Sequence, residues 1–127
     1  IVIEANTMVS MARTEIAPAI EAYLTEIAKA AMTKKELDPT LPRTYETELI
    51  QKLSTLTVQI AARTDELEQA VLDLEQAESM EQEAYAIRDS ILPKMCQLRL
   101  PCDEAETLMA RKYWPFPTYG DLLFGVN

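Results

Sequence analysis

Residues 44–77 read TYETELIQKLSTLTVQIAARTDELEQAVLDLEQA, and this stretch decides the fold. It holds neither glycine nor proline, and its apolar residues recur every three or four positions, which predicts a long amphipathic helix. Thr44 is the predicted N-cap, with Glu46 and Glu48 in the first turn. Arg63 interrupts the apolar stripe, so we expect it either to pair with a carboxylate of another helix or subunit, or to extend its stem to solvent. The apolar members of the stripe are Leu49, Leu53, Leu56, Ile60, Leu67, Ala70, Leu74 and Ala77.

Two similar helices are predicted on either side of this one. Residues 1–33 predict a first helix, which ends at KKELDPTLPR (34–43), a charged loop with two prolines. Residues 79–113 predict a third helix, which stops before Pro115. At about 1.5 Å per residue, each helix would be roughly 50 Å long.

The join between the second and third helices contains no glycine or proline, so its position is inferred from helix capping. Ser79 and Gln82 have the spacing of a capping box, which predicts a turn at residues 76–80; one continuous helix is the alternative. Helices of equal length with short joins predict an all-α fold, an up-down-up antiparallel bundle of three long helices over residues 1–112. Residues 113–127 are predicted to form an irregular docking tail rich in aromatic residues and proline.

Internal prolines mark both outer helices. A shift of 75 residues carries Pro18 onto Pro93 and the apolar stripe of the first helix onto that of the third. A proline inside a helix removes a backbone hydrogen bond and clashes with the carbonyl four residues back, so each is predicted to kink its helix. Because the outer helices would be parallel, we expect the two bends at one level, curving the bundle around a common partner. Pro101 is a third predicted kink, with a separate short helix starting there as the alternative. The matched pairs are Ala5 and Met80, Val9 and Ala84, Ala12 and Ile87, Ile16 and Ile91, Ile20 and Met95, Tyr23 and Leu98, Ile27 and Cys102, and Ala30 and Ala105.

The composition argues against several classes of function. Twelve basic and 21 acidic residues give a net charge of −9, whereas binding to nucleic-acid phosphates requires a basic face. No apolar run is long enough to span a bilayer, so no membrane partner is expected. The chain has no histidine, and no glycine before Gly120, so we predict no catalytic, cofactor-binding or metal-binding residue. Cys96 and Cys102 lie on different faces of the predicted helix, so we expect two reduced thiols of a cytoplasmic protein.

Two surface patterns have competing interpretations. Residues 65–83 carry eight carboxylates and no basic residue, which favours a solvated helix face, with a site for cations or a basic partner as the alternative. The six methionines are scattered at helical spacing, and we interpret them as residues that fill gaps in the core rather than as a ligand groove.

The segment YWPFPTYGDLLF (113–124) differs from the rest of the chain because it holds five of the eight aromatic residues. Left in water, such a cluster would form an exposed apolar patch, so we expect it to dock in a groove of its own bundle or of another chain. Pro115 and Pro117 fix their φ angles in advance, which reduces the entropy lost on docking. The predicted docking residues are Tyr113, Trp114, Pro115, Phe116, Pro117, Tyr119, Leu122, Leu123 and Phe124.

Three segments of the chain carry a family resemblance. They are IVIEANTMVSMARTEIAPAI (1–20), EAYAIRDSILPKM (83–95) and DEAETLMARKYWPFPTYGDLLF (103–124). Together they resemble the C-terminal region of type III glutamine synthetases, the large bacterial and cyanobacterial form of that enzyme. The last segment is the most specific of the three, whereas Pro101 departs from the family pattern.

The resemblance implies that the chain is a piece of a longer enzyme. Such an enzyme joins ammonia to glutamate with ATP and a divalent metal, in a homo-dodecamer of two stacked hexameric rings, and its catalytic residues lie upstream of this region. The resulting hypothesis is a non-catalytic helical module that packs on the remainder of its chain and on neighbouring subunits. An autonomous acidic adaptor or regulatory binding module is the alternative.

Overall fold

The computed structural model describes residues 1–117, and all regular structure in this part of the chain is helical, as predicted. The first helical segment comprises α1 (Val2–Met11), a π-helical turn η1 (Ala12–Ile16) and α2 (Ala17–Leu37). The second is α3 (Thr44–Leu74). The third comprises α4 (Met80–Ala86), a π-helical turn η2 (Ile87–Ile91) and α5 (Leu92–Leu108), and a 3-10 turn η3 (Arg111–Tyr113) follows it.

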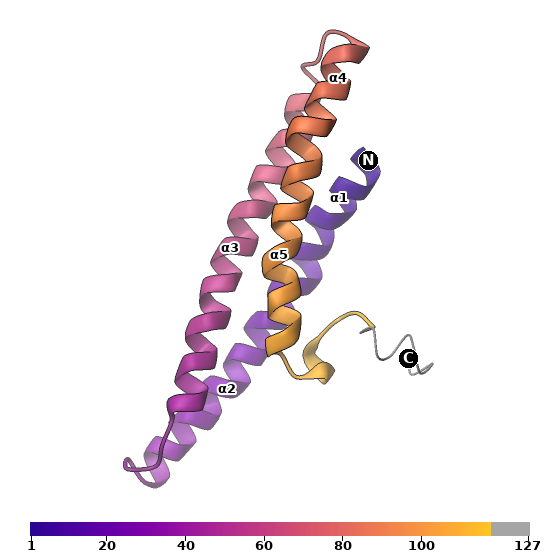
Figure 1. Cartoon of the computed structure of the whole chain (residues 1–127). Helices are drawn as coiled ribbons and strands as arrows, with labels where there is room; N and C mark the ends of the chain where they lie inside the picture. Colours follow the sequence, from indigo (N-terminus) through magenta and orange to yellow (C-terminus); the bar gives the residue numbers. More distant parts are fainter. Residues whose placement is uncertain (118–127) are drawn as a thin grey trace.

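Helix α3 is the central element of the fold. It runs back alongside α1 and α2, and the segment formed by α4 and α5 then runs back alongside α3 (Figure 1). The main contacts between helices join α3 to α2, α1 and α5. The apolar stripe that the sequence predicts on this helix therefore faces both neighbours.

The loop between α2 and α3 differs from the prediction at both of its ends. Helix α2 continues to Leu37 rather than ending near residue 33, and it stops because the extended Asp38 (φ −158°, ψ 108°) precedes Pro39. Thr44 is the first helical residue, so its prediction as the N-cap is wrong. Arg43 takes the cap position, where its guanidinium donates a 3.1 Å hydrogen bond to the Pro39 carbonyl and leaves the helix without a side-chain cap.

A turn at residues 75–79 separates α3 from α4, which excludes one continuous helix. The Ser79 hydroxyl accepts a 3.1 Å hydrogen bond from the Gln82 N–H, as the capping prediction requires. The Gln82 Oε1 atom accepts in return from the Glu78 N–H at 2.7 Å, whereas a regular capping box uses the N–H of the N-cap residue, here Ser79. Backbone hydrogen bonds from Glu75, Gln76 and Ala77 close the last turn of α3, and capping side chains start α4 without glycine or proline.

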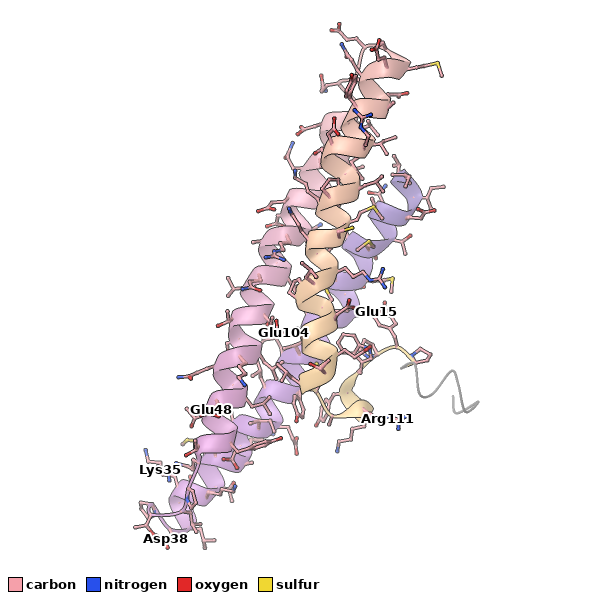
Figure 2. All side chains as sticks on the ribbon, in the orientation of Figure 1. Glu15, Lys35, Asp38, Glu48, Glu104 and Arg111 are labelled. Atoms are coloured by element: carbon pink, nitrogen blue, oxygen red, sulfur yellow. The ribbon has the colours of Figure 1, made fainter. Side chains whose placement is uncertain are left out.

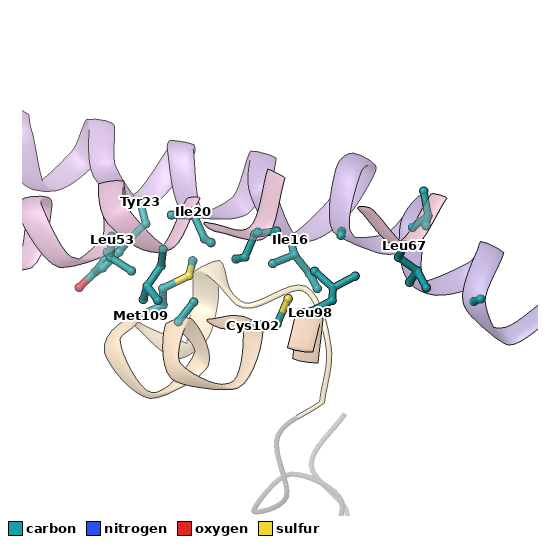
Figure 3. Packing of buried hydrophobic residues seen from close by; sticks show 14 of the residues in the cluster. Ile16, Ile20, Tyr23, Leu53, Leu67, Leu98, Cys102 and Met109 are labelled. Atoms are coloured by element: carbon teal, nitrogen blue, oxygen red, sulfur yellow. The ribbon is translucent and has the colours of Figure 1, made fainter. Parts of the chain in front are cut away.

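The core is a continuous cluster of buried side chains from all three helical segments. Figure 3 shows the labelled members of this cluster meeting between the ribbons, with Ile20, Tyr23 and Leu53 at one level and Ile16, Leu98 and Cys102 at the next. Most of the stripe predicted on α3 is buried; Arg63, Leu74 and Ala77 are partly exposed.

The stripes of the two outer helices match in sequence, but they are buried over different lengths. Ala5 is 0% exposed, whereas its counterpart Met80 is 86% exposed, because α4 extends past the N-terminal end of α1 (Figure 1). At the opposite end Ala30 is exposed and its counterpart Ala105 is buried, because α2 extends past the end of α5. The stripes that match in sequence are therefore not equivalent core faces at the two ends of the bundle. Three helices pack together only in the middle of the bundle.

Candidate docking site

Helix α5 ends five residues before the predicted end of the third helix at residue 113. The last helical residue is Leu108, and Met109 is extended (φ −93°, ψ 149°). Its side chain is 7% exposed and belongs to the core cluster. Burial of Met109 accompanies a change of chain direction that brings the next residues onto the bundle.

Tyr113 packs directly on the first helical segment. Its ring lies 5.1 Å from the ring of Tyr23 on α2, with an interplanar angle of 51°. Burial raises the pKa of both phenols, and the neighbouring Glu26 carboxylate raises the pKa of Tyr113 further. Both rings are therefore neutral near neutral pH and act as packing surfaces.

Trp114 and Phe116 complete the described part of the aromatic segment. Their rings meet edge to face at 6.2 Å, and both residues pack against the core cluster. The Trp114 Nε1 atom is buried and has no hydrogen-bond acceptor in the described structure. Pro115 and Pro117 are exposed. The remaining predicted docking residues, Tyr119, Leu122, Leu123 and Phe124, lie outside the described residues.

Each of the two matched prolines follows a π-helical turn. Pro18 comes two residues after η1, and Pro93 comes two residues after η2. Their rings would strike the carbonyls of Thr14 and Asp89, four residues back, and both of these residues lie inside the π turns. A π turn is wider than an α-helical turn, so it gives the ring room without ending the helix.

Pro101 lies inside α5, and the helix continues through it. This excludes a separate helix starting at Pro101. In an α-helix the missing Pro101 N–H would have bonded to the Gln97 carbonyl. The Arg63 guanidinium donates a 2.6 Å hydrogen bond to that carbonyl from α3. Arg63 thus meets a backbone carbonyl instead of a carboxylate, and it supplies the donor that the proline lacks.

Two carboxylates of the acidic stretch at residues 65–83 bind an arginine of the first helical segment. Arg13 of η1 forms a bidentate contact with Glu68 at 2.6 and 2.9 Å, and a third hydrogen bond joins it to Asp65 at 2.8 Å. These bonds hold the pKa of Arg13 above its usual range and that of Glu68 below its usual range. All three side chains are substantially exposed, so the network orients η1 on α3 and contributes little free energy. Other charged side chains, such as Glu48 of α3 and Glu104 of α5, stand on the exposed surface (Figure 2).

Glu46, in the first turn of α3, is a buried carboxylate near the loop that joins α2 to α3. It is 5% exposed and pairs with Lys34 of α2, while its Oε2 atom is buried without a partner in the described structure. The hydrogen bond from Lys34, and a second from its own backbone amide, hold the pKa of Glu46 below its usual value of 4.5. The pair therefore joins α2 to α3 across the loop.

Acid is expected to weaken this joint. A lowered folded-state pKa means that the pair stabilises the fold above about pH 4.5 and loses this contribution as the pH falls through the lower folded value. The Glu46→Gln variant should have a lower urea midpoint than wild type at pH 7, and the difference should shrink below about pH 4.5. Glu48→Gln, an exposed change two residues away, is the matched control. A Glu46→Gln difference that stays constant from pH 7 to pH 3 would contradict the assignment.

Sequence reasoning missed the interactions that join the helices. Arg13, Lys34 and Glu46 had no predicted role in holding helices together, and Arg63 was not connected with Pro101. The last connection was available in the sequence, since a proline at position 101 frees the carbonyl at position 97. The partners of Arg13 and Lys34 depend on the register between helices, which the sequence pattern does not define.

The described residues offer no group of three or more histidine, cysteine, aspartate or glutamate side chains that could hold a metal ion. No helix within residues 1–117 is long and apolar enough to cross a membrane.

Comparison with known proteins connects the chain to one enzyme. A glutamine synthetase from Butyrivibrio fibrisolvens is 29% identical to it over 126 residues, which cover 98% of this chain and 18% of that protein. No family model matches the chain, and no solved structure matches it. The chain thus spans about one fifth of the length of this relative, which is consistent with a fragment of a glutamine synthetase.

Proposed function

We propose that this chain is a non-catalytic helical module at the C-terminus of a type III glutamine synthetase. The observation that carries the proposal is the similarity along 98% of the chain to less than a fifth of a longer glutamine synthetase. The YWPFPTYGDLLF motif supports the assignment to type III. The parent enzyme would be cytoplasmic, would ligate ammonia to glutamate with ATP and a divalent metal, and would hold its catalytic residues outside this chain.

The role of the module in this proposal is packing and assembly. Tyr113, Trp114 and Phe116 already pack on the bundle, and the tail would extend this contact to the catalytic core or to a neighbouring subunit of a homo-dodecamer. The up-down-up bundle and the kinks at Pro18, Pro93 and Pro101 belong to the same proposal, in which the matched bends curve the outer helices around the partner surface. A crystal structure with either outer helix straight through its matched proline would contradict this part.

The test is truncation of the full-length enzyme after the position of Lys112. We expect the truncated enzyme to lose its large assembly in sedimentation velocity, and to lose glutamine formation with it, because the removed aromatic side chains supply the apolar contact. Exchange of the exposed Val58 for alanine in the full-length enzyme is the control. Unchanged assembly, stability and activity after truncation would refute the anchoring role. ATP-dependent glutamine formation by the 127-residue chain alone would refute the non-catalytic assignment.

An autonomous acidic binding module is the second candidate function. A groove with an acidic rim, beside the aromatic segment, favours it.

A further inference from the structure

A groove of about 350 Å³ lies between the first helical segment and α5. Met8, Met11 and Ile16 line it on one side, and Leu98 and Cys102 line it on the other. Burial raises the pKa of the Cys102 thiol to about 11, so this side chain stays neutral and adds to the apolar lining. We call this feature the α1–α5 groove. Trp114 and Phe116 contribute to its lining from the aromatic segment.

Both outer segments contribute to the lining of the groove. Both pack mainly on α3, and the space between them on the other side is not filled by a helix of residues 1–117. A space between two helices accepts a third, whose side chains fit between the ridges of its neighbours. Met8 and Met11 line the groove and are only partly buried, so the sequence-based interpretation of these two as core filling is incomplete. Methionine is adaptable and is common on surfaces that bind apolar helices.

The charged residues that line the groove favour an occupant of one sign of charge. Among its lining residues are one cation, Arg99, and two carboxylates, Asp103 and Glu106. Arg99 lies 3.7 Å from Asp103, so these two largely offset each other and Glu106 leaves the groove acidic. The whole chain has a net charge of −9, which adds a general attraction for cations. An occupant with basic flanks is therefore favoured over an acidic one.

A third feature of the groove is a polar group that has no partner within residues 1–117. The Trp114 indole N–H is buried and has no acceptor within the described structure. A buried donor that stays unpaired is costly, and buried tryptophan N–H groups usually find an acceptor. A carboxamide side chain, or a free carbonyl from the last turn of a helix, would satisfy it.

We propose that the α1–α5 groove binds a basic amphipathic helix of another protein chain. Large apolar side chains of that helix contact Met8, Met11 and Phe116, and lysine or arginine residues beside them face Asp103 and Glu106. This inference holds whether the chain works inside a larger enzyme or alone, so it does not depend on the relation to glutamine synthetase.

The test uses the 127-residue chain and an 18-residue leucine–lysine peptide with helical periodicity and one glutamine. Trp114 is the sole tryptophan of the chain, so its emission reports binding at the groove. We expect the peptide to change this emission and to bind at least about tenfold more tightly than a leucine–glutamate peptide of the same pattern. Equal affinity for the two peptides would overturn the proposal.

Two pairs of variants distinguish the groove from the rest of the acidic surface. Met11→Glu places a charge in the groove, whereas Met32→Glu places the same charge on an exposed methionine of α2. We expect the first to weaken binding by at least about tenfold and the second by no more than about twofold. The second pair reverses a charge: Glu106→Lys lies in the groove, and Glu48→Lys lies on the exposed surface of α3. We expect the same difference in binding, and this pair replaces the first if Met11→Glu fails to fold. Equal effects within both pairs would contradict the proposal.

Two outcomes would assign the groove to a different occupant. If the chain binds the peptide only after truncation at Pro117, then its own C-terminal residues fill the groove. If the chain alone self-associates in sedimentation experiments and Met11→Glu abolishes this, the occupant is a second copy. Either result overturns the proposal that the groove receives a helix from a different protein. Binding by the intact, monomeric chain supports it.

Discussion

Replacing Leu98 by alanine is expected to lower the free energy of unfolding by about 2–5 kcal/mol. Leu98 is 1% exposed and lies in the middle of α5, where three helical segments meet. Its removal loses the transfer free energy of the side chain and leaves a cavity between α3, α5 and η1. Because a domain of this size is stabilised by only about 5–15 kcal/mol, this change removes a large part of the total.

The matched control is Leu100→Ala on the same helix. Leu100 is 65% exposed, so this change should alter the free energy of unfolding by no more than about 0.5 kcal/mol. Leucine and alanine have similar helix propensities, so the difference between the two variants reports burial. Urea unfolding followed by circular dichroism measures both, with the m-value as a check that the unfolding transition is comparable. Equal losses for the two variants would contradict the packing of α5 on α3.

The helices of this chain follow from local sequence. Residues 44–77 predict α3 because a stretch without glycine or proline, with apolar residues three and four apart, is stable only as an amphipathic helix against a partner. The turn before α4 was equally predictable, since Ser79 and Gln82 cap a helix through contacts a few residues apart. Such signals need no knowledge of the tertiary structure.

The extent of burial did not follow from sequence. Ala5 and Met80 occupy matching positions in two similar stripes, yet their exposure is opposite because the helices end at different levels. A helical period records which face is apolar, and it does not record where a neighbouring helix stops. The same limit applies to the candidate site. Aromatic content predicted that the tail docks, but the contact between Tyr113 and Tyr23 depends on where α5 ends.

The hydrogen bond from Arg63 to Gln97 leads to the second prediction. Arg63→Met keeps an unbranched apolar stem but removes the donor. It leaves the Gln97 carbonyl without the partner that Pro101 also fails to supply. We expect the free energy of unfolding to fall by about 1 kcal/mol, because the exposed carbonyl loses a charged donor and has only water to replace it. Arg99→Met is the control, because it removes an exposed cation of α5 two residues before Pro101. It should cost about 0.5 kcal/mol or less.

The cause of that loss can be isolated with a double-mutant cycle. Pro101→Ala restores a backbone N–H that can bond to the Gln97 carbonyl, so Arg63 is no longer its only available donor. In this background Arg63→Met should cost about 0.5 kcal/mol less than in the wild type. Additive effects of the two substitutions in urea unfolding would mean that Arg63 stabilises the bundle by packing alone. A clear coupling would instead show that a residue of α3 keeps α5 helical across its internal proline, and it would explain how α5 continues through Pro101 to the aromatic segment.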